Sequence, residues 1–343
     1  MRRDEFGLHR IVYDVDGHTA ASVQALLQQV PDLRRDVDVE ALRLQIARTP
    51  DLTRTFLRAV REVPPGQSQF ASPPPSPLPV ERGVGGERST AKVPLEGLLS
   101  SSVARVMASG KQVGVALSGG LDSAMVLAWA RAHGDVTAYV LNPQLESYSE
   151  LAGAQHTAKA LGAKLRVVDV DEADFLRVLP LAIKTIEVPI YNAHPVAKLL
   201  LAQAMRDDGV DVALTGDGAD HVMNRDRQAN YLPLVQALFD VAGVGLRSPF
   251  LDDDVVARLL TLPPDRDKRV LREIADRLHV PAPLVTGPKL SRLAPPIDVE
   301  SIVTRAQIER VEALLEREAS MPTDADKMLW STTALLLQQF DLL

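Results

Sequence analysis

The sequence predicts an α/β protein in which a five-stranded parallel sheet, with helices on both faces, is followed by a mainly helical C-terminal half. Short and nearly continuous apolar runs alternate with helical patterns between residues 96 and 220. This alternation is typical of parallel strands that are buried on both faces. After Gly218 the apolar residues recur at helical spacing, so we expect no further strands in that half.

The N-terminal part looks like a small unit of its own. It has one extended stretch at 8–15 and helical patterns at 19–30 and 38–48. A unit of this size is marginal as a free-standing domain, so we expect it to lean on the rest of the chain. Residues 64–96 are dense in Pro, Ser and Gly and predict a linker. The predicted domains are an N-terminal segment at 1–63, a linker at 64–95 and a main domain at 96–343.

The main domain shows its elements in order. A helix comes first and is followed by strands that alternate with helices, and then by helices alone. The apolar end of the last helix is either core or an oligomer contact. The strands that can be placed are 113–117, 136–141, 164–170 and 210–216. The predicted helices are 95–109, 123–134, 149–162, 172–186, 195–209, 254–263, 268–279, 299–318 and 325–340.

Composition excludes several classes of function. The chain of 343 residues has no cysteine, which excludes disulfides, thiolate zinc sites and a cysteine nucleophile. A formal net charge of −7 without a basic block argues against nucleic acid as a partner. The charged N-terminus and the lack of an 18-residue apolar run give no sign of a secretory signal or a membrane span, so we expect a cytoplasmic protein.

The first strand of the sheet ends in an unusual loop, SGGLDS, at residues 118–123. In an open parallel sheet, ligands bind at the carboxyl ends of the strands. Gly119 and Gly120 would let the backbone approach a ligand and adopt unusual φ and ψ angles. Backbone amides, the helix N-terminus and the hydroxyls of Ser118 and Ser123 would then form a phosphate cradle.

The acidic residue inside this loop restricts the kinds of ligand that the loop could bind. The loop matches neither the Walker A nor the Rossmann pattern, and Asp122 would repel phosphates unless a divalent cation lay between them. Mg²⁺ takes one or two carboxylates together with phosphate oxygens. We therefore predict a magnesium-nucleotide site that holds pyrophosphate; the alternative is a glycine-containing turn without a ligand.

This loop resembles the PP-loop of the N-type ATP pyrophosphatases, which split ATP into an adenylate and pyrophosphate. The resemblance implies the HUP, or adenine nucleotide α-hydrolase-like, fold for the sheet. A second loop, TGDGADH at 215–221, follows the strand at 210–216. Its carboxylate Asp220 would join Asp122 as a ligand of Mg²⁺; the alternative is a polar turn in which an Asp caps a helix.

Further blocks make the resemblance more specific. The order and spacing of four blocks are similar to the synthetase domain of the asparagine synthetases, whose relatives include β-lactam synthetases and lasso-peptide cyclases. The similarity covers about residues 96–292. Residues 49–67 resemble the stretch that joins the glutaminase and synthetase domains of that family, so the N-terminal segment would be a glutaminase remnant. Without a cysteine, we expect no functional glutaminase. The four blocks are Thr215–His221, Arg247–Asp252, Lys268–Glu273 and Lys289.

The resemblance implies an AMP-forming amide ligase with ATP and Mg²⁺ as cofactors. A carboxylate would be adenylated with release of pyrophosphate, and an amine or ammonia would then take the acyl group. Lys289 would be the catalytic lysine, and Asp217 with Asp252 would form the base. The remaining assignments are Ser118, Gly119, Gly120, Ser123 and Lys268 for phosphates, Thr215, Gly216 and Leu141 for the nucleoside, and Asp122 and Asp220 for the metal.

Each of the weaker assignments has an alternative. Lys289 and Lys268 could be surface lysines, Asp252 could cap the helix that follows it, and Arg247 could pair with a substrate carboxylate or with Asp252. The family usually has ELFGGY after its second block, whereas this chain has HVMNRDRQANY from His221. This departure favours an acceptor other than aspartate, as expected in specialised metabolism.

Three other functions remain open. They are an ammonia-dependent asparagine synthetase, a non-catalytic nucleotide-binding descendant that acts through a partner protein, and a tRNA-modifying PP-loop enzyme. The last fits the Arg247–Asp252 block and the acidic charge poorly. We expect a small-molecule or peptide carboxylate and an amine donor as substrates, no nucleic acid or membrane as partner, and either a homodimer or a separate partner subunit.

Overall fold

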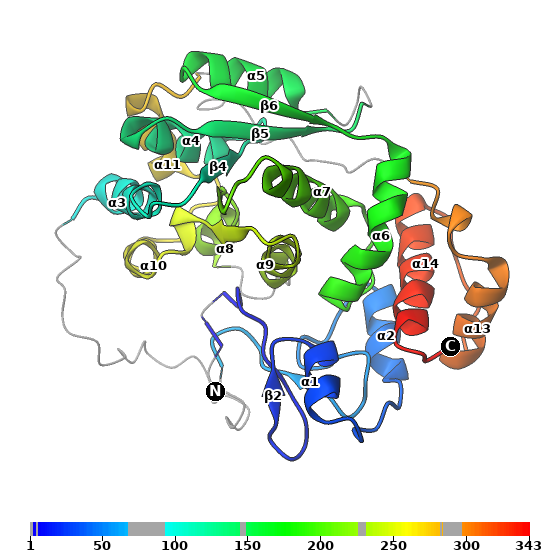
Figure 1. Ribbon diagram of the computed structural model, residues 1–343. Helices are drawn as coiled ribbons and strands as arrows, with labels where there is room; N and C mark the ends of the chain where they lie inside the picture. The colour runs from blue at the N-terminus through cyan, green and yellow to red at the C-terminus, as the bar shows by residue number, and fades with distance from the viewer. Residues whose placement is uncertain are drawn as a thin grey trace.

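A five-stranded parallel sheet forms the centre of the chain in the computed structural model (Figure 1). The strand order is β6-β5-β4-β7-β8, and every neighbouring pair is parallel. The structure describes residues 3–4, 6–67, 93–144, 149–225, 231–281, 283 and 297–343. The strands are β4 (Val113–Ala116), β5 (Thr137–Asn142), β6 (Lys164–Asp169), β7 (Val212–Leu214) and β8 (Gly245–Arg247).

The expectation that strands stop after Gly218 is wrong. β8 lies beyond that residue and pairs in parallel with β7, with Leu214 opposite Arg247. The strand is only three residues long and lies at the edge of the sheet. So short a strand shows no periodicity of its own and is defined by its pairing with β7.

Alternate residues of β4 belong to two different hydrophobic cores, one on each face of the sheet. Val113 and Val115 belong to the core that includes Val126 and Leu271, and Ala116 belongs to the core that includes Ile183 and Leu199. Figure 1 shows α5 (Leu151–Ala160) and α7 (His194–Asp207) on opposite sides of β5. Helices on both faces are therefore confirmed, as a buried parallel sheet requires.

The predicted helices of the main domain are found in the predicted order, except that the one at 299–318 is divided in two, and helices at 219–224 and 231–241 were not predicted. One or two helices separate successive strands up to β8, and the described residues after β8 form helices and no strands. They are α3 (Leu95–Met107), α4 (Leu121–His133), α5 (Leu151–Ala160), α6 (Glu172–Ile186), α7 (His194–Asp207), α8 (Ala219–Asn224), α9 (Tyr231–Val241), η3 (Pro249–Leu251), α10 (Asp253–Leu260), α11 (Arg269–Arg277), η4 (Val299–Ser301), α13 (Arg305–Leu315) and α14 (Asp324–Gln339).

The N-terminal segment packs against the main domain, as predicted from its size. Its elements are β1 (Val12–Tyr13), β2 (Thr19–Ala20), α1 (Val23–Gln29), α2 (Val39–Ile46) and β3 (Arg61–Glu62). The strands form a small antiparallel sheet, and the apolar side chains share one core with α6 and α14. The buried carboxylate of Glu187, just after α6, accepts hydrogen bonds from the amides of Val23 (2.8 Å) and Gln24 (2.7 Å) and from Arg10 (2.6 Å).

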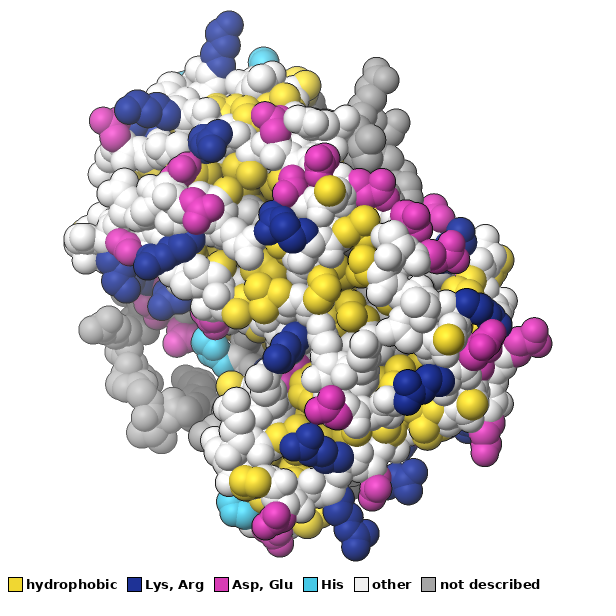
Figure 2. All heavy atoms as spheres, turned by 45° about the vertical axis from the view of Figure 1, so that its right-hand side comes forward, with side chains coloured by type: hydrophobic (Ala, Val, Ile, Leu, Met, Phe, Trp, Pro, Cys, Tyr) yellow, Lys and Arg dark blue, Asp and Glu magenta, His cyan; other side chains and the backbone are white. Residues whose placement is uncertain are grey.

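The C-terminal helix α14 is core. Ten consecutive residues of it, 328–337, are buried, which supports the first of the two alternatives for this apolar stretch. On the face of the molecule in Figure 2, acidic and basic side chains are interspersed. Among the described residues, no helix has the length and apolar character needed to cross a membrane. Most of the predicted linker, residues 68–92, lies outside the described residues.

Candidate active site at the switch point of the sheet

Two loops meet where the strand order reverses. The chain builds β4, β5 and β6 outward in one direction and then returns to the other side of β4 with β7. The loop after β4 carries SGGLDS, and the loop after β7 carries TGDGAD. In open α/β sheets this crevice at the carboxyl ends of the strands is the place where ligands bind.

The SGGLDS loop is held in shape by its two serines. The Ser123 hydroxyl, which is almost fully buried, lies 2.7 Å from the Ser118 hydroxyl and accepts a hydrogen bond from the Ser118 amide at 3.0 Å. The Gly120 amide donates to the Ser118 hydroxyl at 3.2 Å. Gly120 is the N-cap of α4, with φ −105°. The loop therefore ends at a helix N-terminus, as the phosphate-cradle prediction requires.

The expectation of unusual backbone angles at both glycines is wrong. Neither Gly119 nor Gly120 is among the described glycines with positive φ. The missing Cβ at Gly119 matters for space: α5 approaches so closely that a Cβ on Gly153 would lie 3.1 Å from the Gly119 Cα. The Glu150 side chain also lies beside Gly119, which brings a third carboxylate near the cradle.

The second loop packs directly on the first. A Cβ added to Gly216 would lie 2.7 Å from the Ser123 amide nitrogen and 2.8 Å from Asp122 atoms. Gly218 has φ +95°, in the left-handed region, and a Cβ there would lie 2.6 Å from the Leu251 side chain. Glycine is needed at Gly216 because a Cβ has no space, and at Gly218 because of both the space and the positive φ. These contacts join the second loop to the PP-loop and to the Arg247–Asp252 block.

Lys268 links the two predicted metal ligands. Its Nζ lies 2.5 Å from an Asp122 oxygen and 2.8 Å from an Asp220 oxygen, and its side chain is only 8% exposed. Burial lowers the pKa of Lys268, but the charges of the two carboxylates and their hydrogen bonds raise it above its ordinary value overall. The ammonium is therefore charged, and the alternative of a solvated surface lysine is wrong for Lys268.

The carboxylate of Asp217 contacts a hydroxyl and an ammonium near the loop. Its Oδ2 accepts a hydrogen bond from the hydroxyl of Thr215 at 2.7 Å and forms an ion pair with Lys198 of α7, also at 2.7 Å. The side chains of Lys198 and Asp217 are 13% and 16% exposed. A partly buried ion pair of this geometry fixes the orientation of the carboxylate.

Asp252 has partners other than those of Asp217. Asp252 is the N-cap of α10 and accepts a hydrogen bond from the Asp254 amide at 3.3 Å. It also accepts from the hydroxyl of Ser102 at 3.0 Å and pairs with Arg105, both on α3. The alternative in which Asp252 caps the following helix is therefore the one found in the structure.

The remaining predicted residues are placed as follows. Leu141 lies in β5 and is half-buried against the core that contains α7. Arg247 ends β8, is exposed, and donates a hydrogen bond to the Leu246 carbonyl at 2.7 Å. His221 lies in α8 with its ring parallel to that of Tyr231, at 6.4 Å between centroids. Lys289 lies outside the described residues.

The donor set suits a divalent cation. One oxygen each of Asp122 and Asp220 lies within hydrogen-bonding distance of the same Nζ, so the two carboxylates converge on a common point from α4 and α8. Hard oxygen ligands of this kind are those that Mg²⁺ prefers. The residues present therefore fit the predicted ion, with Lys268 beside them as a further cation.

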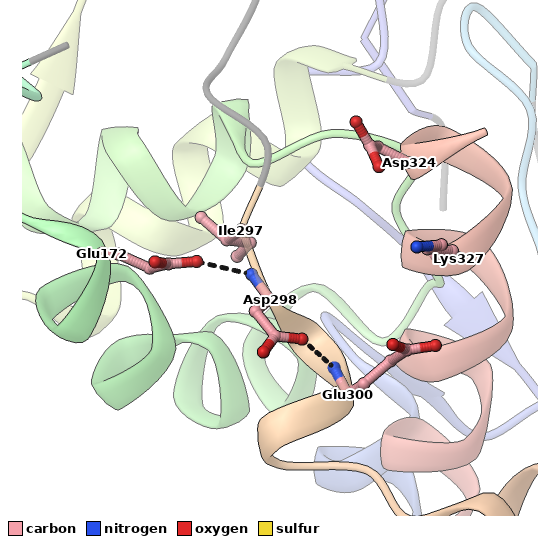
Figure 3. Close-up of a pocket in the computed structure, with 6 residues that line it drawn as sticks. All are labelled: Glu172, Ile297, Asp298, Glu300, Asp324 and Lys327. Atoms are coloured by element: carbon pink, nitrogen blue, oxygen red, sulfur yellow. Dashed lines mark hydrogen bonds between the residues drawn. The ribbon is translucent and has the colours of Figure 1, made fainter.

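A separate pocket lies elsewhere at the starts of α6 and α14. Its volume is about 280 Å³, and Figure 3 shows its side chains. Glu172 accepts a hydrogen bond from the Asp298 amide at 2.6 Å, and Asp298 accepts one from the Glu300 amide at 3.2 Å. None of the predicted site residues lines it; the lining residues are Glu172, Ile297, Asp298, Glu300, Asp324 and Lys327.

The parallel sheet carries SGGLDS, the loop that resembles a PP-loop, at its switch point. Residues 94–229 match the model of the asparagine synthase family. This part of the chain is therefore similar to the synthetase domain of that family.

Known proteins share this domain. A Methanocaldococcus jannaschii protein whose name describes it as a glutamine-hydrolysing asparagine synthetase is 28% identical over 208 residues, covering 50% of this chain and 37% of the relative. A Mycobacterium bovis protein with the same kind of name is 33% identical over 128 residues, covering 36% of this chain and 19% of the relative. The chain thus spans less than half the length of these relatives. Among solved structures, the NMN synthetase of Francisella tularensis has a TM-score of 0.39 at 15% identity, over 72% of this chain and 93% of that one.

Proposed function

We propose that this protein is an ATP-dependent amide ligase that adenylates a carboxylate and transfers the acyl group to an amine or ammonia. The observation that carries the proposal is the contact between the two loops at the switch point, where Lys268 pairs with both Asp122 and Asp220. The asparagine synthase match over residues 94–229 supports the same class of reaction.

The PP-loop would serve the first half-reaction. A substrate carboxylate oxygen attacks the α-phosphorus of ATP, an acyl-adenylate forms and pyrophosphate leaves. We assign the pyrophosphate to the N-terminus of α4, which begins directly after Gly120. The amides of Ser118 and Gly120 donate to hydroxyls within the loop and hold its shape. Lys268 adds a positive charge where charge collects on the leaving group. When bound by Asp122 and Asp220, Mg²⁺ supplies further charge neutralisation at the phosphates.

The second half-reaction needs a proton acceptor. The amine attacks the acyl carbon, AMP leaves, and the nitrogen gives up a proton. We assign the base to Asp217, whose carboxylate is oriented by Lys198 and Thr215. We assign Asp252 a supporting role, because it caps α10 and bonds to α3. Lys289 remains our candidate for the catalytic lysine.

The acceptor is proposed to belong to specialised metabolism, as in β-lactam or peptide cyclisation. The reason is the segment from His221 to Tyr231, which departs from the family pattern beside the second loop. An ammonia-dependent asparagine synthetase is the second candidate. The names of the relatives, which describe glutamine-hydrolysing asparagine synthetases, favour asparagine as the product but give no support for free ammonia as the donor. The contacts of Lys268 with both Asp122 and Asp220 favour both enzymes over a non-catalytic descendant.

The proposal is tested by carboxylate-dependent exchange of labelled pyrophosphate into ATP. A panel of amino acids, other small carboxylates and short peptides is screened with the wild-type protein. We expect exchange with a subset of the panel and its loss, by about 100-fold or more, in Asp122→Asn. Asp135→Asn, which changes a fully exposed carboxylate, is the matched control and should exchange normally. Release of ADP and phosphate in place of AMP and pyrophosphate would rule the proposal out.

A further inference from the structure

Lys268 lies at the point where the two acidic loops converge, and the geometry gives it a role beyond contact with phosphate. Its Nζ is within 2.8 Å of one oxygen from each of Asp122 and Asp220. The residue as a whole is 7% exposed. A compact ammonium in this position neutralises two carboxylates that would otherwise repel each other.

The backbone at Lys268 is anchored independently of this ion pair. Lys268 has φ 54°, in the left-handed region, and forms the N-cap of α11. Its amide donates to the Asp265 carbonyl at 3.2 Å, and the Asp265 amide donates to the Met223 carbonyl of α8 at 3.0 Å. The Lys268 carbonyl accepts from Arg272 at 2.9 Å. The flexible side chain is therefore the part of Lys268 that can exchange one anion for another.

A divalent cation and this ammonium compete for the same oxygens. Two like charges a few ångströms apart repel each other in this partly buried site, where the side chains of Asp122 and Asp220 are 20% and 34% exposed. Each carboxylate oxygen that binds Nζ is removed from the set available to a metal. The phosphates of a nucleotide in the neighbouring cradle would offer the ammonium another anion. Transfer of Nζ to a phosphate would then leave both carboxylates to the metal.

We propose that Lys268 is a built-in counter-ion that makes metal binding at Asp122 and Asp220 depend on the nucleotide. The site binds a divalent cation only when pyrophosphate or a nucleoside triphosphate attracts the ammonium away from the two carboxylates. Nucleotide and metal therefore bind together with positive coupling, and the metal alone binds weakly. This inference rests on the proposed function for the identity of the nucleotide.

The test is direct binding of Mn²⁺, measured by electron paramagnetic resonance of the free ion and by calorimetry. The full chain is titrated with and without α,β-methylene-ATP, which cannot be cleaved at the α-phosphorus. We expect the wild type to bind Mn²⁺ at this site only with the analogue. Lys268→Met and Lys268→Gln should bind Mn²⁺ without it, at least about tenfold more tightly than the wild type, because the competing charge is gone.

Two controls tie the effect to this site. Lys198→Met removes the ammonium that pairs with Asp217, and it should not create analogue-independent Mn²⁺ binding. Adding Asp220→Asn to either Lys268 variant should abolish the new binding. Far-UV circular dichroism and thermal unfolding are measured for each variant, and the Gln variant, which keeps a hydrogen-bond donor, serves if the Met variant does not fold.

The inference is overturned if the wild type binds Mn²⁺ equally well with and without the analogue, or if both Lys268 variants keep the wild-type dependence. Its failure can be told apart from failure of the proposed function. The counter-ion role alone would be overturned if the wild type catalyses carboxylate-dependent pyrophosphate exchange but binds metal independently of the nucleotide. A wild type that never binds the analogue would overturn the proposed function.

Discussion

Replacing Gly216 with alanine should both destabilise the protein and damage nucleotide binding. A Cβ at this position would lie 2.7 Å from the Ser123 amide nitrogen and 2.8 Å from two Asp122 atoms. Ordinary van der Waals contact starts at 3.4 Å, so the two loops must separate by about 0.7 Å. Most of the nearby atoms are backbone, which cannot rotate away. Overpacking of this kind costs about 1–3 kcal/mol.

The assays are urea unfolding and binding of α,β-methylene-ATP with Mg²⁺. We expect Gly216→Ala to lose about 1–3 kcal/mol of unfolding free energy and to bind the analogue about 10- to 100-fold more weakly, because the loops shift by a sizeable fraction of an ångström. Gly97→Ala is the matched control, because its Cβ would meet only the Val93 side chain, at 3.6 Å. This substitution should lower neither the unfolding free energy nor the affinity for the analogue. A Gly216→Ala protein with wild-type stability and affinity would refute the close approach of the two loops.

Three further substitutions separate structural from chemical roles. Asp252→Asn keeps a good N-cap and should keep both the unfolding free energy and the exchange activity. Asp252→Ala should lose about 1 kcal/mol of unfolding free energy in urea. Loss of exchange in a stable Asp252→Asn protein would instead make Asp252 catalytic. Lys198→Met should lower the unfolding free energy by about 1–3 kcal/mol, because it removes the ion pair with Asp217. It should also slow amide formation more than pyrophosphate exchange. An equal loss of both activities would contradict the assignment of Asp217 as the base. Burial raises the pKa of Asp38, but the hydrogen bond and charge of Arg54 lower it below its ordinary value. The stability from this carboxylate is therefore present above about pH 4 and lost as the pH falls through the lowered pKa, so Asp38→Asn should lose less unfolding free energy than the wild type between pH 7 and pH 3.

The fold could be predicted largely from local patterns. β4 and β5 are nearly continuous apolar runs, and such runs separated by helices have few alternatives to a parallel sheet. The shape of the sheet then places both acidic loops at the same edge without further information. β8 was missed because its three residues are defined by pairing with β7 and not by a pattern of their own.

The partners of the site residues were harder to predict because they are distant in sequence. Lys268 meets Asp122 across 146 residues, and Asp252 meets Arg105 across 147. No local motif reports which of several charged side chains will meet after folding. Lys198 was missed for the same reason, since in the sequence it is an ordinary lysine within an apolar helix.

Attack of a substrate carboxylate on the α-phosphorus of ATP is the step on which the proposed function depends. The most direct measurement follows the oxygen atoms of the carboxylate that gives the fastest pyrophosphate exchange. With that substrate labelled by ¹⁸O in the carboxyl group and with its amine partner present, the account predicts one ¹⁸O atom in the AMP that is released and none in inorganic phosphate or pyrophosphate. Appearance of the label in phosphate, together with ADP, would contradict the account.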